Sequence, residues 1–173
     1  MTDVAPAREA LTWQFDMVWS LAQYHLPALT DEMCTWEPAP GAWTVRPTDD
    51  GWVADWADEE PDPVPAVTIG WVCWHIAWWW SETVARARGE EPPGRTGVRY
   101  PGSADGVRAQ LTALAEQWRE ILADLDDAAL SRPSTFPWPD ERPFATTIAW
   151  AHAELMKNVA EIGLLRTVHR ART

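Results

Sequence analysis

Apolar residues recur at helical spacing in four separate segments of the 173-residue chain. These segments are residues 8–29, 66–88, 103–127 and 146–170. The third has the clearest stripe, in which Leu111, Leu114 and Trp118 lie on one helical face. Without a repeat period or a central sheet, the pattern predicts an all-α fold, a four-helix bundle. A chain of this length can bury one core, so we expect a single domain over residues 1–173.

Residues 30–65, between the first two predicted helices, form a long aromatic- and proline-rich connection. Its prolines interrupt any helical pattern; they are Pro38, Pro40, Pro47, Pro61, Pro63 and Pro65. Residues 42–46 and 51–53 have strand-like composition on either side of an Asp50-Gly51 turn signal. Two interpretations stay open for this connection: a loop that caps one end of the bundle, or a lid that lines a pocket.

The second predicted helix has recognisable start and stop signals. Thr68 is suited to capping its N-terminus, and Gly89 is a natural stop after Arg88. Proline-rich loops over residues 90–102 and 131–143 then separate the remaining helices. These signals predict where the second helix begins and ends.

Charge and apolar content exclude several classes of protein. A formal net charge of −12 repels phosphate backbones, which argues against nucleic-acid binding by a basic face. The most apolar stretch, residues 64–80, is short and contains His75, so we expect no membrane span. Residues 1–10 lack the apolar run of a signal peptide, and the two cysteines form no CxxC motif. A reduced, cytoplasmic location is therefore expected.

Fourteen tryptophans are an unusual number for a chain of this length. Because an indole ring is large and carries one N–H group, we expect some rings in the core and others around a cleft.

His75 is the first candidate for chemistry, because it lies among apolar residues of the second predicted helix. A buried imidazole must find a partner or stay neutral, so a core histidine with a structural hydrogen bond is the alternative. Glu154 and Asn158 are four residues apart and share one face of the last helix, and Glu161 extends this row. The alternative for this row is a solvated or internally paired helix edge.

His152 lies on a different part of the last helix. Helical geometry places it about 160° around the axis from Glu154, so the two cannot share one ligand set in a regular helix. It is either a buried structural histidine or a pocket residue approached from another side. Cys73 precedes His75 by two residues and points away from it, which disfavours a Cys/His metal pair.

Four stretches of the sequence together resemble the DinB-like superfamily, and more narrowly its actinobacterial branch related to mycothiol-dependent maleylpyruvate isomerase. They cover most of the chain and are residues 13–16 (WQFD), 36–45 (WEPAPGAWTV), 68–77 (TIGWVCWHIA) and 154–163 (ELMKNVAEIG). Their order and spacing, more than any one of them, carry the resemblance.

The resemblance implies a four-helix bundle that holds a divalent metal in a pocket. Family members use a histidine of the second helix and two residues four apart in the last helix, which correspond here to His75, Glu154 and Asn158. The usual pair is His and His, or Glu then His in the isomerase relatives. Asn158 departs from this pattern, since an amide oxygen is a weak ligand for zinc or nickel.

Two functions from different classes follow. The first is a metal-dependent transferase or isomerase that uses zinc or nickel and a low-molecular-weight thiol. Its pocket would be formed by Trp43, Trp71, the Trp78–Trp80 run, His152 and Glu161. The second is a non-catalytic, small-ligand-binding or stress-related bundle that has lost its metal. In both, the partner is a small molecule, and pairing of two copies into a homodimer is an open expectation.

Overall fold

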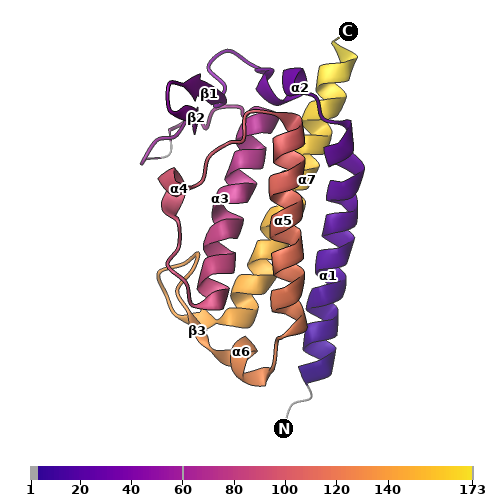
Figure 1. Cartoon of the computed structure of the whole chain (residues 1–173), viewed down its shortest axis with the longest axis vertical. Helices are drawn as coiled ribbons and strands as arrows, with labels where there is room; N and C mark the ends of the chain where they lie inside the picture. The colour runs from indigo at the N-terminus through magenta and orange to yellow at the C-terminus, as the bar shows by residue number, and fades with distance from the viewer. Residues whose placement is uncertain (1–3, 60, 173) are drawn as a thin grey trace.

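The computed structural model describes residues 4–59 and 61–172, and this part of the chain is predominantly helical. Its four long helices are α1 (Val4–His25), α3 (Ile69–Arg88), α5 (Ala104–Ala123) and α7 (Phe144–Ala171). Each packs against two others, since α3 and α1 both contact α5 and α7. α1 and α7 run in one direction, and α3 and α5 run in the other (Figure 1).

Side-chain caps and glycine set the ends of these helices. The Thr68 hydroxyl accepts a hydrogen bond from the Trp71 amide at 3.2 Å, and Gly89 ends α3 in the left-handed conformation. Both features confirm the predicted start and stop of this helix. The first helix ends earlier than predicted, because Pro27 lies in a short 3-10 turn, η1 (Leu26–Ala28).

The connection between α1 and α3 contains more regular structure than its prolines suggest. It holds a short helix, α2 (Asp31–Thr35), and an antiparallel hairpin of β1 (Val45–Thr48) and β2 (Gly51–Ala54). The first strand begins later than the composition predicts, because Trp43 pairs instead with Val67 in a parallel bridge. This bridge ties the connection to the segment that leads into α3.

The remaining short elements lie in the two proline-rich loops. They are α4 (Gly94–Gly97), α6 (Asp127–Ser131), β3 (Pro133–Ser134) and β4 (Arg142–Pro143), and the last two pair antiparallel. Periodicity does not predict such short elements, because each is held by its neighbours.

The core between the long helices is rich in aromatic side chains. Phe15, Trp80 and Trp118 are almost fully buried and belong to three different helices. Trp13, in contrast, is 67% exposed. Some tryptophans therefore lie in the core, as expected, while Trp13 lies on the surface. Over the described ranges, every helix falls short of the length and apolarity that crossing a bilayer requires.

Candidate functional site

His75 and Glu154 face each other across the contact between α3 and α7. His75 Nε2 lies 3.5 Å from Glu154 Oε1, and both side chains are mostly buried, with 18% and 17% of their surface exposed. Lys157, one turn after Glu154, places Nζ 2.6 Å from the same carboxylate oxygen. The packing of the two helices thus brings together two of the three residues implied by the resemblance.

The carboxylate of Glu154 is held in its charged form. Burial alone would raise its pKa, but hydrogen bonds and charges from His75 and Lys157 outweigh burial and lower the pKa of Glu154. A carboxylate that is ionised in a mostly buried position attracts cations and hydrogen-bond donors.

Aromatic rings surround the imidazole of His75. Trp71 stacks on it with ring centroids 5.0 Å apart and an interplanar angle of 9°. Trp78 meets it edge-on at 5.8 Å. Trp43 and Trp56, from the connection between α1 and α3, pack against Trp71 at 5.5 and 6.5 Å. The connection therefore both covers the start of α3 and supports one wall of this site.

Two polar atoms in this aromatic cluster are buried without a partner. They are His75 Nδ1 and Trp78 Nε1, which make no hydrogen bond to any described residue. A buried polar atom without a partner is costly, and such atoms often mark a functional site. Both belong to side chains that contact one another beside Glu154.

Asn158 lies one turn from Glu154, but its amide is engaged elsewhere. Its side chain is almost fully buried; Oδ1 accepts a hydrogen bond from Trp79 Nε1 at 3.2 Å, and Nδ2 donates to Glu161 Oε2 at 3.0 Å. The structure thus groups Asn158, Trp79 and Glu161 in one network. No hydrogen bond joins these three to His75 in the described ranges.

His152 lies on the side of α7 that faces α1 and α5. The Trp118 indole donates to its Nε2 at 2.9 Å, and Gln14 Oε1 lies 3.1 Å from its Nδ1. Burial lowers the pKa of His152 to about 4, so the ring is neutral near pH 7. Its ring and polar contacts are with α1 and α5, and none with His75 or Glu154 occurs among residues 4–59 and 61–172.

The residues at this site do not fit a metal held by three protein side chains. Across the described part of the chain, no three His, Cys, Asp or Glu residues form a group that could bind an ion. His75 and Glu154 supply two donors. The Asn158 oxygen, which is a weak ligand in any case, already accepts the Trp79 N–H.

Lys157 and Trp56 are site residues that pattern analysis missed. Lys157 follows Glu154 by three residues, a spacing that places the two side chains together on a helix and could have identified it. Trp56 lies in a connection without periodicity, so no sequence signal placed it beside Trp71. The ring that contacts His75 from the Trp78–Trp80 run is Trp78, three residues further along the helix.

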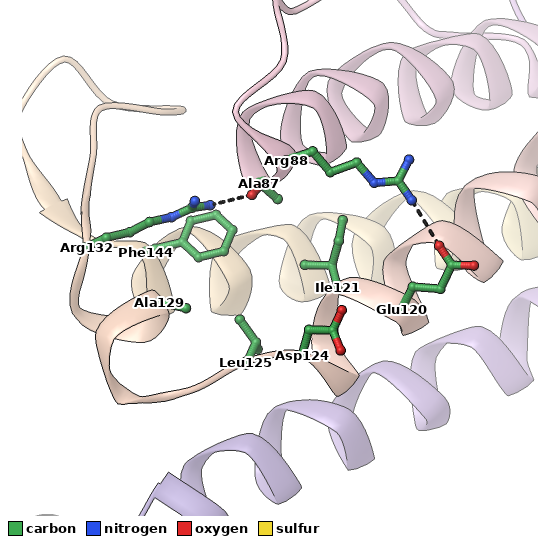
Figure 2. A pocket seen from close by; sticks show the side chains of 9 residues that line it. All are labelled: Ala87, Arg88, Glu120, Ile121, Asp124, Leu125, Ala129, Arg132 and Phe144. Carbon is green, nitrogen blue, oxygen red and sulfur yellow. Dashed lines mark hydrogen bonds and ion pairs between the residues drawn. The ribbon is translucent and has the colours of Figure 1, made fainter.

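A pocket at the opposite end of α3 has a different character. It has a volume of about 240 Å³ and lies where α3, α5 and α6 end (Figure 2). Its arginines serve the surrounding structure: Arg88 donates to Glu120, and Arg132 donates to the Ala87 carbonyl at 3.1 Å while covering the Phe144 ring. Its charged groups are thus largely committed to holding helix ends together.

Comparison with known proteins identifies a family to which the chain is similar. A family model described as the DinB superfamily matches residues 50–162, which is more than half of the chain and includes both His75 and Glu154. None of the curated proteins compared with the chain matches it.

A solved structure has a similar fold. It is described as the crystal structure of the conserved protein of locus from Enterococcus faecalis, with 11% identity, a TM-score of 0.60 and 97% of each chain covered. At this identity the likeness concerns the fold alone. The residues matched by the family model lead to one conclusion: this chain belongs to the DinB superfamily.

Proposed function

We propose that this protein binds a small molecule at the His75–Glu154 pair and that it does so without a metal held by three side chains. One observation carries the proposal: the Asn158 amide is bonded on both sides, to Trp79 and to Glu161. Because the amide at the third ligand position is already satisfied, only His75 and Glu154 remain to meet a ligand.

The surroundings of the pair favour a ligand with a flat or apolar part and a polar group. Trp71 and Trp78 offer ring surfaces beside the imidazole, a setting typical of small-molecule sites. The ionised Glu154 accepts hydrogen bonds, and the ammonium group of Lys157 beside it adds a donor.

The metal content of protein purified without chelator or nickel affinity resin tests the proposal. We expect wild-type protein to be free of zinc and nickel and to bind neither when each is added. An Asn158→His variant should gain zinc, approaching about one equivalent, because imidazole is a strong ligand where an amide is a weak one. Elemental analysis and calorimetric titration measure both results.

An Asn158→Leu variant is the matched control, since it also frees Trp79 and Glu161 but supplies no ligand. It should bind no zinc. Stoichiometric metal in the wild-type protein, or no gain of zinc in Asn158→His, would contradict the proposal.

A second candidate is a metal-dependent thiol transferase or isomerase, the activity implied by the resemblance to the actinobacterial isomerase branch. The 3.5 Å approach of His75 Nε2 to Glu154 Oε1 favours it, because two good donors converge there. Zinc or nickel with a low-molecular-weight thiol would be required. Retained metal together with thiol-dependent turnover in the wild-type protein would favour this candidate over the first.

The wider setting of the protein is also a proposal. We propose a single-domain, cytoplasmic protein, supported by two buried free thiols that suit a reducing compartment. The net charge of −12 supports a small-molecule partner over a nucleic acid. A stress-related role and a homodimer formed through helix faces stay predictions, and sedimentation of the purified protein measures the second.

A further inference from the structure

A second cleft, separate from the His75–Glu154 pair, lies between the β1–β2 hairpin and the segment around α4. Figure 1 shows the hairpin and α4 on the same side of α3. The cleft has a volume of about 360 Å³, which falls within the range of small-molecule sites. It is lined by Trp52, Val53, Ala54, Trp74, Arg95, Thr96, Val98 and Arg99.

The walls of this cleft are held in place by contacts within the protein. Trp74 belongs to α3 and donates its indole N–H to the Val98 carbonyl at 2.8 Å. Trp52 belongs to β2 and packs edge-on against Tyr100 at 5.3 Å. Arg99 donates to the backbone carbonyl of Asp50 in the hairpin turn. These contacts fix two indole rings and one guanidinium group before any ligand arrives.

The lining carries positive charge in a strongly acidic protein. Among the described residues that line it, Arg95 and Arg99 are the ionisable ones, whereas the whole chain has a net charge of −12. Arg95 lies over the Trp56 ring at 4.9 Å, and its ion pair with Asp58 is 3.5 Å long and open to solvent, since the Asp58 side chain is 95% exposed. Exposed pairs of this kind are weak, so the guanidinium can exchange Asp58 for another anion.

Each of the two guanidinium groups also has N–H donors available for a ligand. The group has five N–H donors, and the bonds of Arg99 and Arg95 described above use few of them. A planar carboxylate can accept two of these donors side by side, which makes it the anion best matched to an arginine.

We propose that this cleft binds an aromatic carboxylate, with its ring between Trp52 and Trp74 and its carboxylate on Arg95 and Arg99. The two indole rings supply the apolar and stacking surface, and the two arginines supply the charge. Trp74 and Trp78 stack at 5.9 Å and separate the cleft from His75. The cleft is therefore a second site with its own lining, next to the one proposed above.

Calorimetric titration with 2-naphthoate and with its neutral isostere 2-naphthamide tests this site. The carboxylate should bind and the amide should bind about tenfold more weakly, because hydrogen bonds to charged groups are the stronger ones. A double Arg95→Gln, Arg99→Gln variant should lose about tenfold in naphthoate affinity and little in naphthamide affinity. Circular dichroism of the variant checks that it is folded.

Arg142→Gln is the matched control. Like Arg95, Arg142 covers an indole ring, Trp138 at 4.6 Å, and pairs with a nearby aspartate, Asp140 at 2.7 Å, but it lies outside the cleft. It should bind naphthoate as the wild type does. Equal affinity for acid and amide, or an unchanged affinity in the folded double variant, would overturn the proposal. Loss of naphthoate binding in a Glu154→Gln protein would assign the probe to the other site and would overturn it as well.

Discussion

His75 and His152 are both mostly buried histidines, yet their surroundings differ. His152 has both ring nitrogens satisfied: the Trp118 indole can only donate, so Nε2 accepts and Nδ1 carries the proton toward Gln14. His75 has Nε2 beside Glu154, and its Nδ1 has no hydrogen-bond partner among the described residues. We therefore interpret His152, with both ring nitrogens hydrogen-bonded, as a structural histidine. His75, with one ring nitrogen unsatisfied, is the candidate site residue.

The neutral state of His152 predicts a dependence of stability on pH. Its pKa is about 4 in the folded chain against an ordinary value of 6.5, so the unfolded chain binds the extra proton between these values. The free energy of unfolding should therefore fall as the pH drops through this window, by about 3 kcal/mol in total. Urea unfolding at several pH values measures it.

A His152→Gln variant provides the control for this prediction, because glutamine can accept from Trp118 but does not titrate. The difference in stability between wild type and variant should change between pH 6.5 and pH 4. A constant difference across that range would contradict the assignment. Carboxylates that titrate in the same region affect both proteins alike, so the comparison removes them.

At the scale of elements, the start of α3 is wedged against the connection that precedes it. A Cβ atom on Gly70 would lie 2.8 Å from both the Cys34 carbonyl oxygen and Val45 Cγ2. α2 and β1 therefore approach this helix more closely than any residue other than glycine allows. This contact holds the connection over α3, and with it Trp43 and Trp56 against Trp71.

Replacement of Gly70 by alanine should loosen this junction. We expect Gly70→Ala to lower the free energy of unfolding by about 1–3 kcal/mol, since the added methyl meets backbone atoms that cannot turn aside. Chemical denaturation measures the change. Gly97→Ala in the exposed helix α4 is the control; its added methyl would lie 3.2 Å from the side chain of Pro93 and not from backbone, so we expect a smaller loss than at Gly70. An equal loss in the free energy of unfolding for both variants would contradict a close contact between Gly70 and the preceding connection.

At the scale of the whole molecule, aromatic packing closes the interior around two thiols. Cys34 and Cys73 are buried and unpaired, and burial raises the pKa of both, that of Cys73 well above its ordinary value. A thiol that is buried and protonated is a poor nucleophile. A thiol reagent can therefore reach Cys34 and Cys73 only when the packed helices open.

Labelling with a thiol reagent tests this. Both cysteines should resist the reagent in the native protein and react together as denaturant unfolds it, because one core encloses them. Quantified labelling across a urea titration should follow the circular-dichroism transition. A Ser20→Cys variant, with its thiol at an exposed position of α1, should label at once. Rapid labelling of the wild type under native conditions would contradict the packing described here.

The sequence by itself determined the helical character of the chain, the start and end of α3, and the positions of His75 and Glu154. These features depend on periodicity, capping chemistry and family motifs, all of which act over a few residues. The sequence also predicted a hairpin around Asp50-Gly51, but the short helices and the β3–β4 pair escaped prediction because tertiary contacts stabilise them. The exact start of β1, for example, depends on the pairing of Trp43 with Val67, which is distant along the chain.

Only the tertiary structure decided what the candidate site contains. Whether Asn158 faces His75 or Trp79 depends on the rotation and register of α7 against α3, which no local pattern specifies. The arginine-lined cleft likewise arises where a hairpin, a loop and Trp74 of α3, far apart in sequence, come together. Local sequence patterns identify the candidate residues. Which side chains those residues contact depends on the packing of helices that are distant along the chain.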